Sequence, residues 1–137
     1  MFKLNEEFDC AISYMQNSAE TYFYGGCAEF VLNRAKSKNK VCFIHCDFLN
    51  YGGNTKYNRE ILKKFNKIAV VSNSVGKRLL TAVPSLEDKV YTVHNCVNYS
   101  EIERLKDEYE PKIKSKGISL FTASRISAEK GILRMFP

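Results

Sequence analysis

The chain has 137 residues, 45% of them hydrophobic, and a formal net charge of +6. It is long enough for one compact domain with a core and too short for two complete ones. No apolar run approaches the roughly 18 residues of a membrane-spanning helix, and Glu6 and Glu7 stand where a secretory signal would be apolar. We therefore expect a soluble, cytoplasmic protein, whose positive charge favours an anionic partner without identifying it.

Short apolar runs alternate with helical stretches along the chain. Strands are expected at 9–13, 40–46, 67–72, 89–94 and 118–123, and helices at 21–36, 57–65, about 74–81, about 101–109 and after 127. The run KVCFIHC at 40–46 shows no alternation, which predicts a strand buried on both faces. The helix starts are assigned to Asn73 or Ser74, to a capping box of Ser100 with Glu103, and to Ser127.

This order predicts an α/β fold, a Rossmann-like parallel sheet with flanking helices joined by right-handed crossovers. Ligands of such sheets bind at the carboxyl ends of the strands. The residues to inspect are therefore Tyr14, His45 to Phe48, Asn73, Ser74, Asn95 and Ser124 to Lys130.

The five cysteines lack the paired CxxC spacing of a zinc site, and their number is odd. Cys42 and Cys46 fall in an apolar run, where a free thiol behaves as a small hydrophobic group. We expect neither a disulfide framework nor a bound metal.

The last strand, loop and helix form the sharpest candidate site. Arg125 leaves the strand, and Lys130 lies in the first turn of the helix that Ser127 caps. The free N–H groups of a helix start, an Arg fork and a Lys charge can together hold a diphosphate. A structural alternative, in which Arg125 pairs with Glu129 and Lys130 is solvated, stays open on spacing alone.

Ser124-Arg125-Ile126 followed by Glu129-Lys130-Gly131 resembles the start of the C-terminal domain in retaining glycosyltransferases of the GT-B fold, family 4. Ala123 or Ser124 stands where members usually have glycine, a mild departure. Three earlier stretches resemble bacterial capsule and cell-wall members in the same order: FIHCDF at 43–48, IAVVSNSV at 68–75 and KVYTVHNCVN at 89–98.

The resemblance implies a partial GT-B enzyme that moves a sugar from a nucleotide-diphosphate sugar to a cell-surface polysaccharide or lipid-linked acceptor. It implies no cofactor or metal beyond that co-substrate. Arg125 and Lys130 correspond to the family's ligands of the donor diphosphate. His45 is the catalytic candidate beside the transferred sugar, although a structural hydrogen bond is an equal alternative. Asp47, Asn95 and Ser124 are candidates for lining the cleft, with Asp47 either fixing the tautomer of His45 or capping the next loop.

The resemblance also divides the chain. Residues 1–110 correspond to the C-terminal part of the acceptor-side domain, 111–117 to a linker and 118–137 to the first βα unit of the donor-binding domain. The family's Glu-x7-Glu motif lies further along than Pro137, so we expect a truncated enzyme with little or no activity alone. The resemblance also leaves open a peripheral association of the protein with the inner face of the membrane.

Two alternative classes of function are considered beside the glycosyltransferase. A non-catalytic nucleotide- or phosphate-binding module of Rossmann-like fold would share the basic strand ends. A nucleic-acid-binding domain is disfavoured, because aromatic and basic residues do not interleave on one segment.

Overall fold

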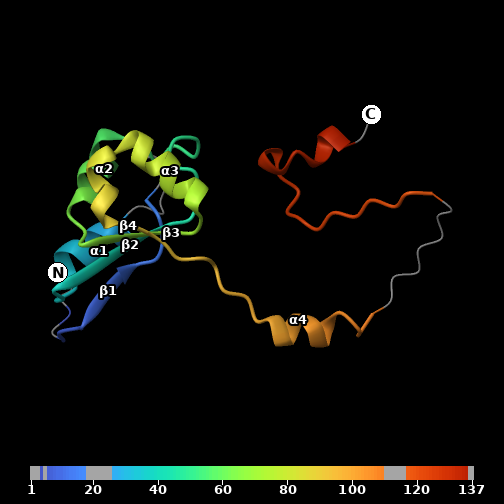
Figure 1. The fold of residues 1–137 in the computed structure, drawn as a ribbon, viewed down its shortest axis with the longest axis horizontal. Coiled ribbons are helices and arrows are strands. Elements are labelled where there is room, and N and C mark those ends of the chain that lie inside the picture. The colour runs from blue at the N-terminus through green and yellow to red at the C-terminus, as the bar shows by residue number, and fades with distance from the viewer. Residues whose placement is uncertain (1–3, 5, 18–25, 110–116, 136–137) are drawn as a thin grey trace. The chain divides into compact units, whose positions relative to one another are not determined.

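The computed structural model describes residues 4, 6–17, 26–109 and 117–135 (Figure 1). The chain divides into two compact units, Met1–Cys96 and Val97–Pro137. The linker expected at 111–117 lies outside the described residues except for Gly117. None of the helices in the described ranges has the length and apolar character needed to cross a membrane.

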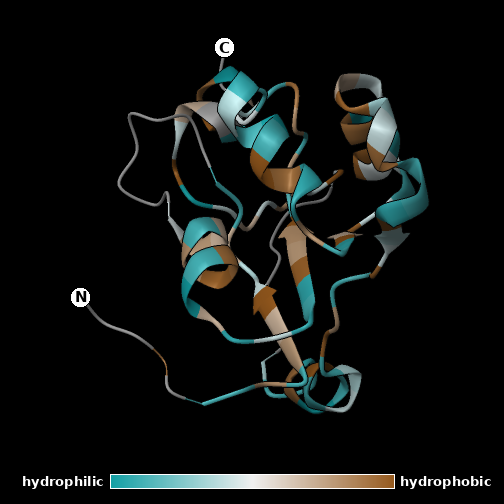
Figure 2. Ribbon diagram, turned by 90° about the vertical axis from the view of Figure 1, so that its left-hand side faces the viewer, coloured by the Kyte–Doolittle hydropathy of each residue, from teal (hydrophilic) through white to brown (hydrophobic). Residues whose placement is uncertain are grey.

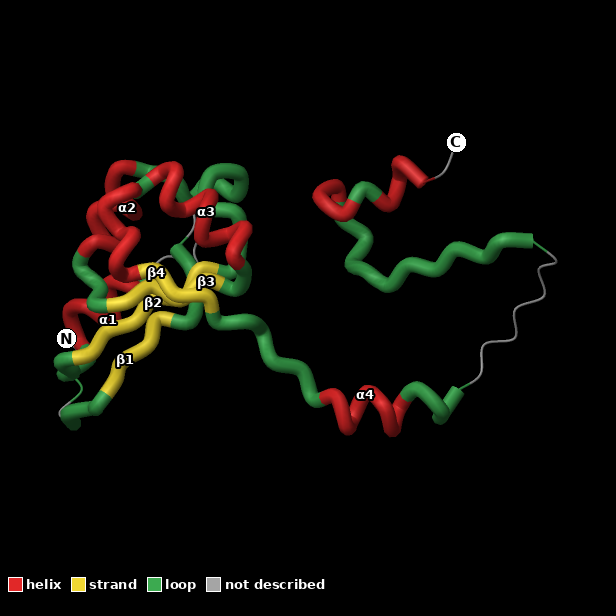
Figure 3. Tube along the Cα trace, in the orientation of Figure 1, coloured by secondary structure: helices red, strands yellow, loops and turns green. Residues whose placement is uncertain are grey.

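The first unit is built on a four-stranded sheet with all strands parallel, as the alternation of elements predicts (Figure 3). The strands are β1 (Cys10–Ser13), β2 (Asn39–Ile44), β3 (Lys67–Val70) and β4 (Val90–Thr92). They lie in the sheet in the order of the sequence, β1-β2-β3-β4. The described part of the first unit is therefore α/β and consistent with a Rossmann-like fold.

The connections between these strands are α1 (Cys27–Arg34), α2 (Lys56–Lys63), α3 (Asn73–Ala82) and the 3-10 helix η1 (Pro84–Lys89). Right-handed crossovers between strands that add successively to one edge put every helix on the same face of the sheet. Residues of α1, α2 and α3 accordingly share a single core cluster with β2 and β3. The N-terminal part of the helix expected at 21–36 falls in 18–25, outside the described residues.

The two faces of the sheet differ in burial. Ser13, Cys42, Ile44, Ile68 and Val70 point toward the helices and are buried. On the other face, Ile12, Tyr14 and Tyr91 are about half exposed, and Val41 and Phe43 are only partly buried. In Figure 2 the strands carry brown stretches of hydrophobic residues together with teal and pale ones. The prediction that 40–46 is buried on both faces is wrong, because no described helix of this unit covers the second face.

The predicted cap of α3 is also wrong. The hydroxyl of Ser72, rather than Asn73 or Ser74, caps α3 by accepting from Val75 N at 3.2 Å. The helix therefore starts earlier than the sequence reading placed it.

The second unit contains α4 (Tyr99–Leu105) and two 3-10 helices, η2 (Ala128–Lys130) and η3 (Ile132–Met135). Asn98, rather than Ser100, caps α4 by accepting from Glu101 N at 3.2 Å. Ser127 precedes η2 without a side-chain capping hydrogen bond.

The strand expected at 118–123 does not form. These residues pair with no strand in the described structure, and Ile118 and Phe121 are 92% and 93% exposed. A strand needs a partner for its backbone N–H and C=O groups, and the described part of this unit contains no other strand. The predicted βα unit at 118–137 is therefore represented by an extended segment and short 3-10 turns.

Candidate functional site

A cleft of about 470 Å³ opens at the carboxyl ends of the strands in the first unit. Its lining comes from the segments that follow β1, β2 and β4, namely Tyr14, Met15, Gln16, His45, Cys46, Tyr51, Asn95 and Cys96. This is the edge where parallel α/β sheets bind ligands. The lining combines an imidazole, two amides and two phenol rings, a mixture suited to neutral polar ligands with a flat apolar side.

Gln16 joins the ends of the first two strands. Its Oε1 atom accepts hydrogen bonds from the backbone N–H of His45 at 2.8 Å and of Cys46 at 2.9 Å. Those two N–H groups lie just beyond β2, where no further sheet pairing satisfies them. One side chain from the segment after β1 thus fixes the path of the chain after β2, and it also lines the cleft.

The imidazole of His45 is held from two sides. Its Nε2 atom lies 2.9 Å from the carbonyl oxygen of Tyr14. The ring meets the Tyr14 ring edge-on with centroids 4.6 Å apart, and stacks on Phe43 at 5.6 Å. His45 therefore makes the structural hydrogen bond that was one of its two predicted roles, and its ring also lines the cleft.

Tyr51 forms another part of the lining. Burial raises the pKa of its hydroxyl to about 12, and the nearby polar side chain of Gln16 opposes that rise. Gly53 gives the ring its space: a Cβ atom on this residue would lie 2.4 Å from Cε1 of Tyr51. The preceding Gly52 has φ of 88°, a value that favours glycine, so this glycine pair shapes the loop around the ring.

Asp47 has a different place from the cleft-lining residues. Its carboxylate accepts from Leu49 N at 3.0 Å and from Asn50 Nδ2 at 2.7 Å, and pairs with Arg78 Nε of α3 at 3.0 Å. The sequence left two roles open for Asp47, and these contacts are those of a residue that caps the following loop. The pair also ties this loop to α3.

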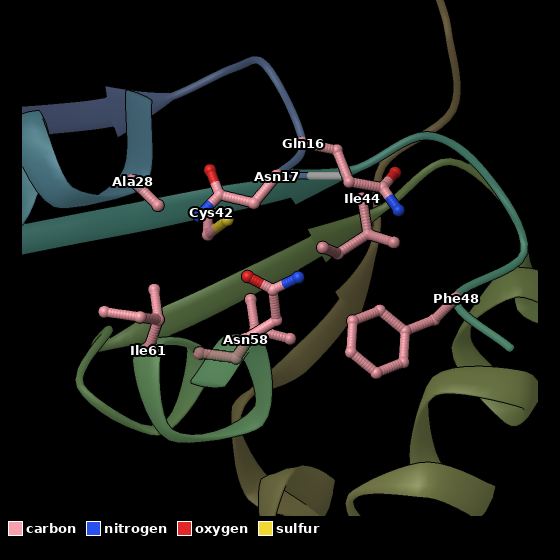
Figure 4. A pocket seen from close by; sticks show the side chains of 9 residues that line it. Gln16, Asn17, Ala28, Cys42, Ile44, Phe48, Asn58 and Ile61 are labelled. Carbon is pink, nitrogen blue, oxygen red and sulfur yellow. The ribbon is translucent and has the colours of Figure 1, made fainter. Parts of the chain in front are cut away.

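A second, much smaller cavity shares Gln16 with the cleft in its lining (Figure 4). It measures about 10 Å³ and lies among Gln16, Asn17, Ala28, Cys42, Ile44, Phe48, Asn58, Ile61 and Leu62. This volume is about the minimum for a single water molecule, so the cavity is not a substrate site. Burial raises the pKa of the Cys42 thiol to about 12, which is the behaviour of a core thiol.

The remaining candidates are distributed over both units. Asn95 lines the cleft of the first unit. Ser124, Arg125 and Lys130 belong to the second unit, where all three are exposed, with Lys130 in η2. Gly131 follows with φ of 66° and ends η2. Arg125 thus precedes η2 and Lys130 lies in it. Because η2 has only three residues, it lacks the longer helix start that the sequence predicted beside this basic pair.

Sequence reasoning missed Gln16. A lone glutamine three residues beyond a strand carries no distinctive signal, since its role depends on which backbone groups the neighbouring strand leaves unpaired. Asn95 was predicted, because it follows a strand and lies in a segment that resembles a known family.

Within the described ranges, no group of three His, Cys, Asp or Glu side chains is arranged to hold a metal ion. The five cysteines are free thiols. Comparison of the chain with protein-family models, with curated proteins and with solved structures gives no match. A functional interpretation therefore rests on the cleft, its chemistry and the sequence resemblance described above.

Proposed function

We propose that this chain carries the sugar-side cleft of a glycosyltransferase that uses a nucleotide-diphosphate sugar. The observation that supports the proposal is the cleft at the carboxyl edge of the sheet, with His45, Asn95 and Tyr51 in its lining. Amide and imidazole groups exchange hydrogen bonds with hydroxyls, and aromatic faces pack against the C–H faces of a sugar ring. The acceptor class is a cell-surface polysaccharide or a lipid-linked glycan.

The second part of the proposal concerns the donor. Arg125 and Lys130 would bind the diphosphate and stabilise the negative charge that develops on it as the glycosidic bond breaks. Both side chains are exposed in the described structure and accessible to a phosphate group. The reaction would keep the anomeric configuration of the sugar, and the chain alone would have little or no transferase activity.

The test is a binding titration of the chain with UDP-glucose, GDP-mannose and the corresponding free diphosphates, followed by NMR. We expect nucleotide sugars to perturb the cleft residues and the diphosphates alone to perturb only residues near Arg125. The double change Arg125→Ala with Lys130→Ala should weaken nucleotide binding by more than tenfold, because two charge-assisted contacts are lost.

A matched control is Lys77→Ala, which removes one positive charge from the exposed side of α3. It should leave nucleotide binding within about twofold. If Lys77→Ala and the double variant weaken binding equally, the attraction is a general effect of net charge and the assignment of a diphosphate site is wrong.

The exposed basic pair also fits the rival function, a nucleotide- or phosphate-binding module without transfer chemistry. This rival predicts equal affinity for a nucleoside diphosphate with and without its sugar. It also predicts no response of His45 or Asn95 to any sugar.

A further inference from the structure

The two histidines of the chain use opposite ring nitrogens to reach backbone carbonyl groups. His45 places Nε2 at 2.9 Å from the oxygen of Tyr14, and His94 places Nδ1 at 3.2 Å from the oxygen of Val71. A carbonyl oxygen only accepts hydrogen bonds, so in each case the ring nitrogen carries the proton. Neutral His45 is then the Nε2–H tautomer, and neutral His94 is the Nδ1–H tautomer.

This assignment leaves the lone pair of His45 on Nδ1. Among the described residues, the hydrogen bond to Tyr14 is the one that the ring makes. The ring lines the cleft while its position is fixed by Tyr14 and Phe43. In a ring held in this way, Nδ1 is the atom that can accept a hydrogen bond, and in the neutral form of His45 this atom cannot donate one.

Gln16 connects the segments after β1 and β2, which bring the Tyr14 carbonyl group and the His45 ring together. The carbonyl that fixes the tautomer belongs to Tyr14, two residues before Gln16, and the ring belongs to one of the residues whose N–H groups Gln16 binds. Two backbone N–H donors converge on one atom of the amide, which must therefore be the oxygen. The distance between the Tyr14 carbonyl and the imidazole thus depends on this side chain.

We propose that Gln16 is a positioning residue that keeps His45 as the Nε2–H tautomer, so that Nδ1 accepts a hydrogen bond from a sugar hydroxyl in the cleft. The ligand-binding half of this inference rests on the proposed function. The chemistry makes the cleft selective, because a hydroxyl can donate to Nδ1, whereas an ionised phosphate or sulfate oxygen can only accept and is repelled by the lone pair.

The first test reads the tautomers in the full chain, labelled with ¹⁵N, by long-range correlation of the imidazole nitrogens at about pH 8, where free imidazole is neutral. We expect Nε2–H for His45 and Nδ1–H for His94, with His94→Gln used to assign the two rings. His94 is the internal control, since the same spectrum must show the opposite pattern. An Nδ1–H tautomer at His45 overturns the inference, whatever the chain binds.

The second test compares two replacements of Gln16. Gln16→Glu keeps an acceptor oxygen for the two N–H groups, so His45 should keep its tautomer. Gln16→Met has similar length and no oxygen acceptor, so His45 should become a mixture of tautomers while His94 stays unchanged. Equal behaviour of both variants contradicts a positioning role, and the unchanged signal of His94 shows that the fold has survived.

The third test adds ligands of known chemistry: methyl α-glucoside, methyl α-mannoside and sulfate. A glycoside that binds should shift the Nδ1 resonance of His45, and Gln16→Met should weaken that binding about tenfold, the effect of one lost hydrogen bond to a fixed acceptor. Sulfate should leave the resonance unchanged. Glycoside binding without a response at Nδ1 overturns this inference and spares the proposed function. Failure of every glycoside and nucleotide sugar to bind overturns the proposed function and the ligand half of the inference, whereas the tautomer result stands separately.

Discussion

The ring of Tyr51 shows how a single contact controls part of the cleft. A methyl group at Gly53 would lie 2.4 Å from Cε1 of this ring, far inside van der Waals contact. Gly53→Ala should therefore push the ring outward and cost about 1–3 kcal/mol in free energy of unfolding, the usual effect of overpacking. Urea unfolding measures this cost, and Gly26→Ala is a poor control because Gly26 has φ of 109°.

The same residue makes a prediction about pH. The pKa of Tyr51 is raised from its usual value of 10.0 to about 12 in the fold, so the neutral hydroxyl is favoured there. The associated stability is complete below about pH 10 and is lost as the pH rises toward 12, because the unfolded chain ionises first. Tyr51→Phe should flatten this loss between these values. An identical alkaline slope in both proteins would show that the Tyr51 hydroxyl is not shielded from water.

Cysteine reactivity gives an independent test of burial. Cys42 is almost fully buried with its thiol pKa raised to about 12, whereas Cys10, Cys27, Cys46 and Cys96 are exposed. The thiolate is the reactive form, so alkylation of the native chain should modify the exposed four and spare Cys42. Peptide mass spectrometry with and without denaturant measures this directly. Rapid native modification of Cys42 would mean that the helices do not cover this face of β2 as described.

For the helices and strands, the presence of an element was easier to predict than its first and last residues. The four parallel strands and the helices between them follow from alternating apolar runs, because burying those runs is the main driving force. The caps of α3 and α4 were assigned too late in the sequence. Several neighbouring polar side chains can cap a helix, and the choice depends on where the preceding strand releases the chain. The strand at 118–123 failed because apolar composition alone supplies no hydrogen-bonding partner.

The capping of α3 can be tested with two serines two positions apart. Ser72→Ala removes the acceptor for Val75 N and should cost about 1 kcal/mol. Ser74→Ala, inside the first turn of the same helix, should cost no stability, since alanine is a better helix former than serine. Chemical denaturation of both variants compares them under the same conditions. A larger loss for Ser74→Ala would restore the cap inferred from sequence.

At the level of the whole unit, helices cover one face of the sheet in the described part of the first unit, and no described helix of that unit covers the other face. Parallel sheets are normally covered on both faces, so this arrangement leaves the stability of the unit dependent on its helix side. The order β1-β2-β3-β4 is the reason, since each right-handed crossover returns a helix to the same face. The sequence predicted a parallel sheet and its ligand-binding edge, but strand order is set by long-range pairing and could not be read from local patterns.

Two isoleucines measure this asymmetry with the same substitution. Ile44 on β2 is 1% exposed and faces the helices, whereas Ile12 on β1 is 51% exposed and lies on the other face. Ile44→Ala should cost about 2–5 kcal/mol in free energy of unfolding, because it removes buried methyl groups and leaves a cavity. Ile12→Ala should cost less than about 1 kcal/mol, because only about half of the Ile12 side chain is buried. Equal losses in denaturant titrations of the two variants would mean that the second face is covered in solution.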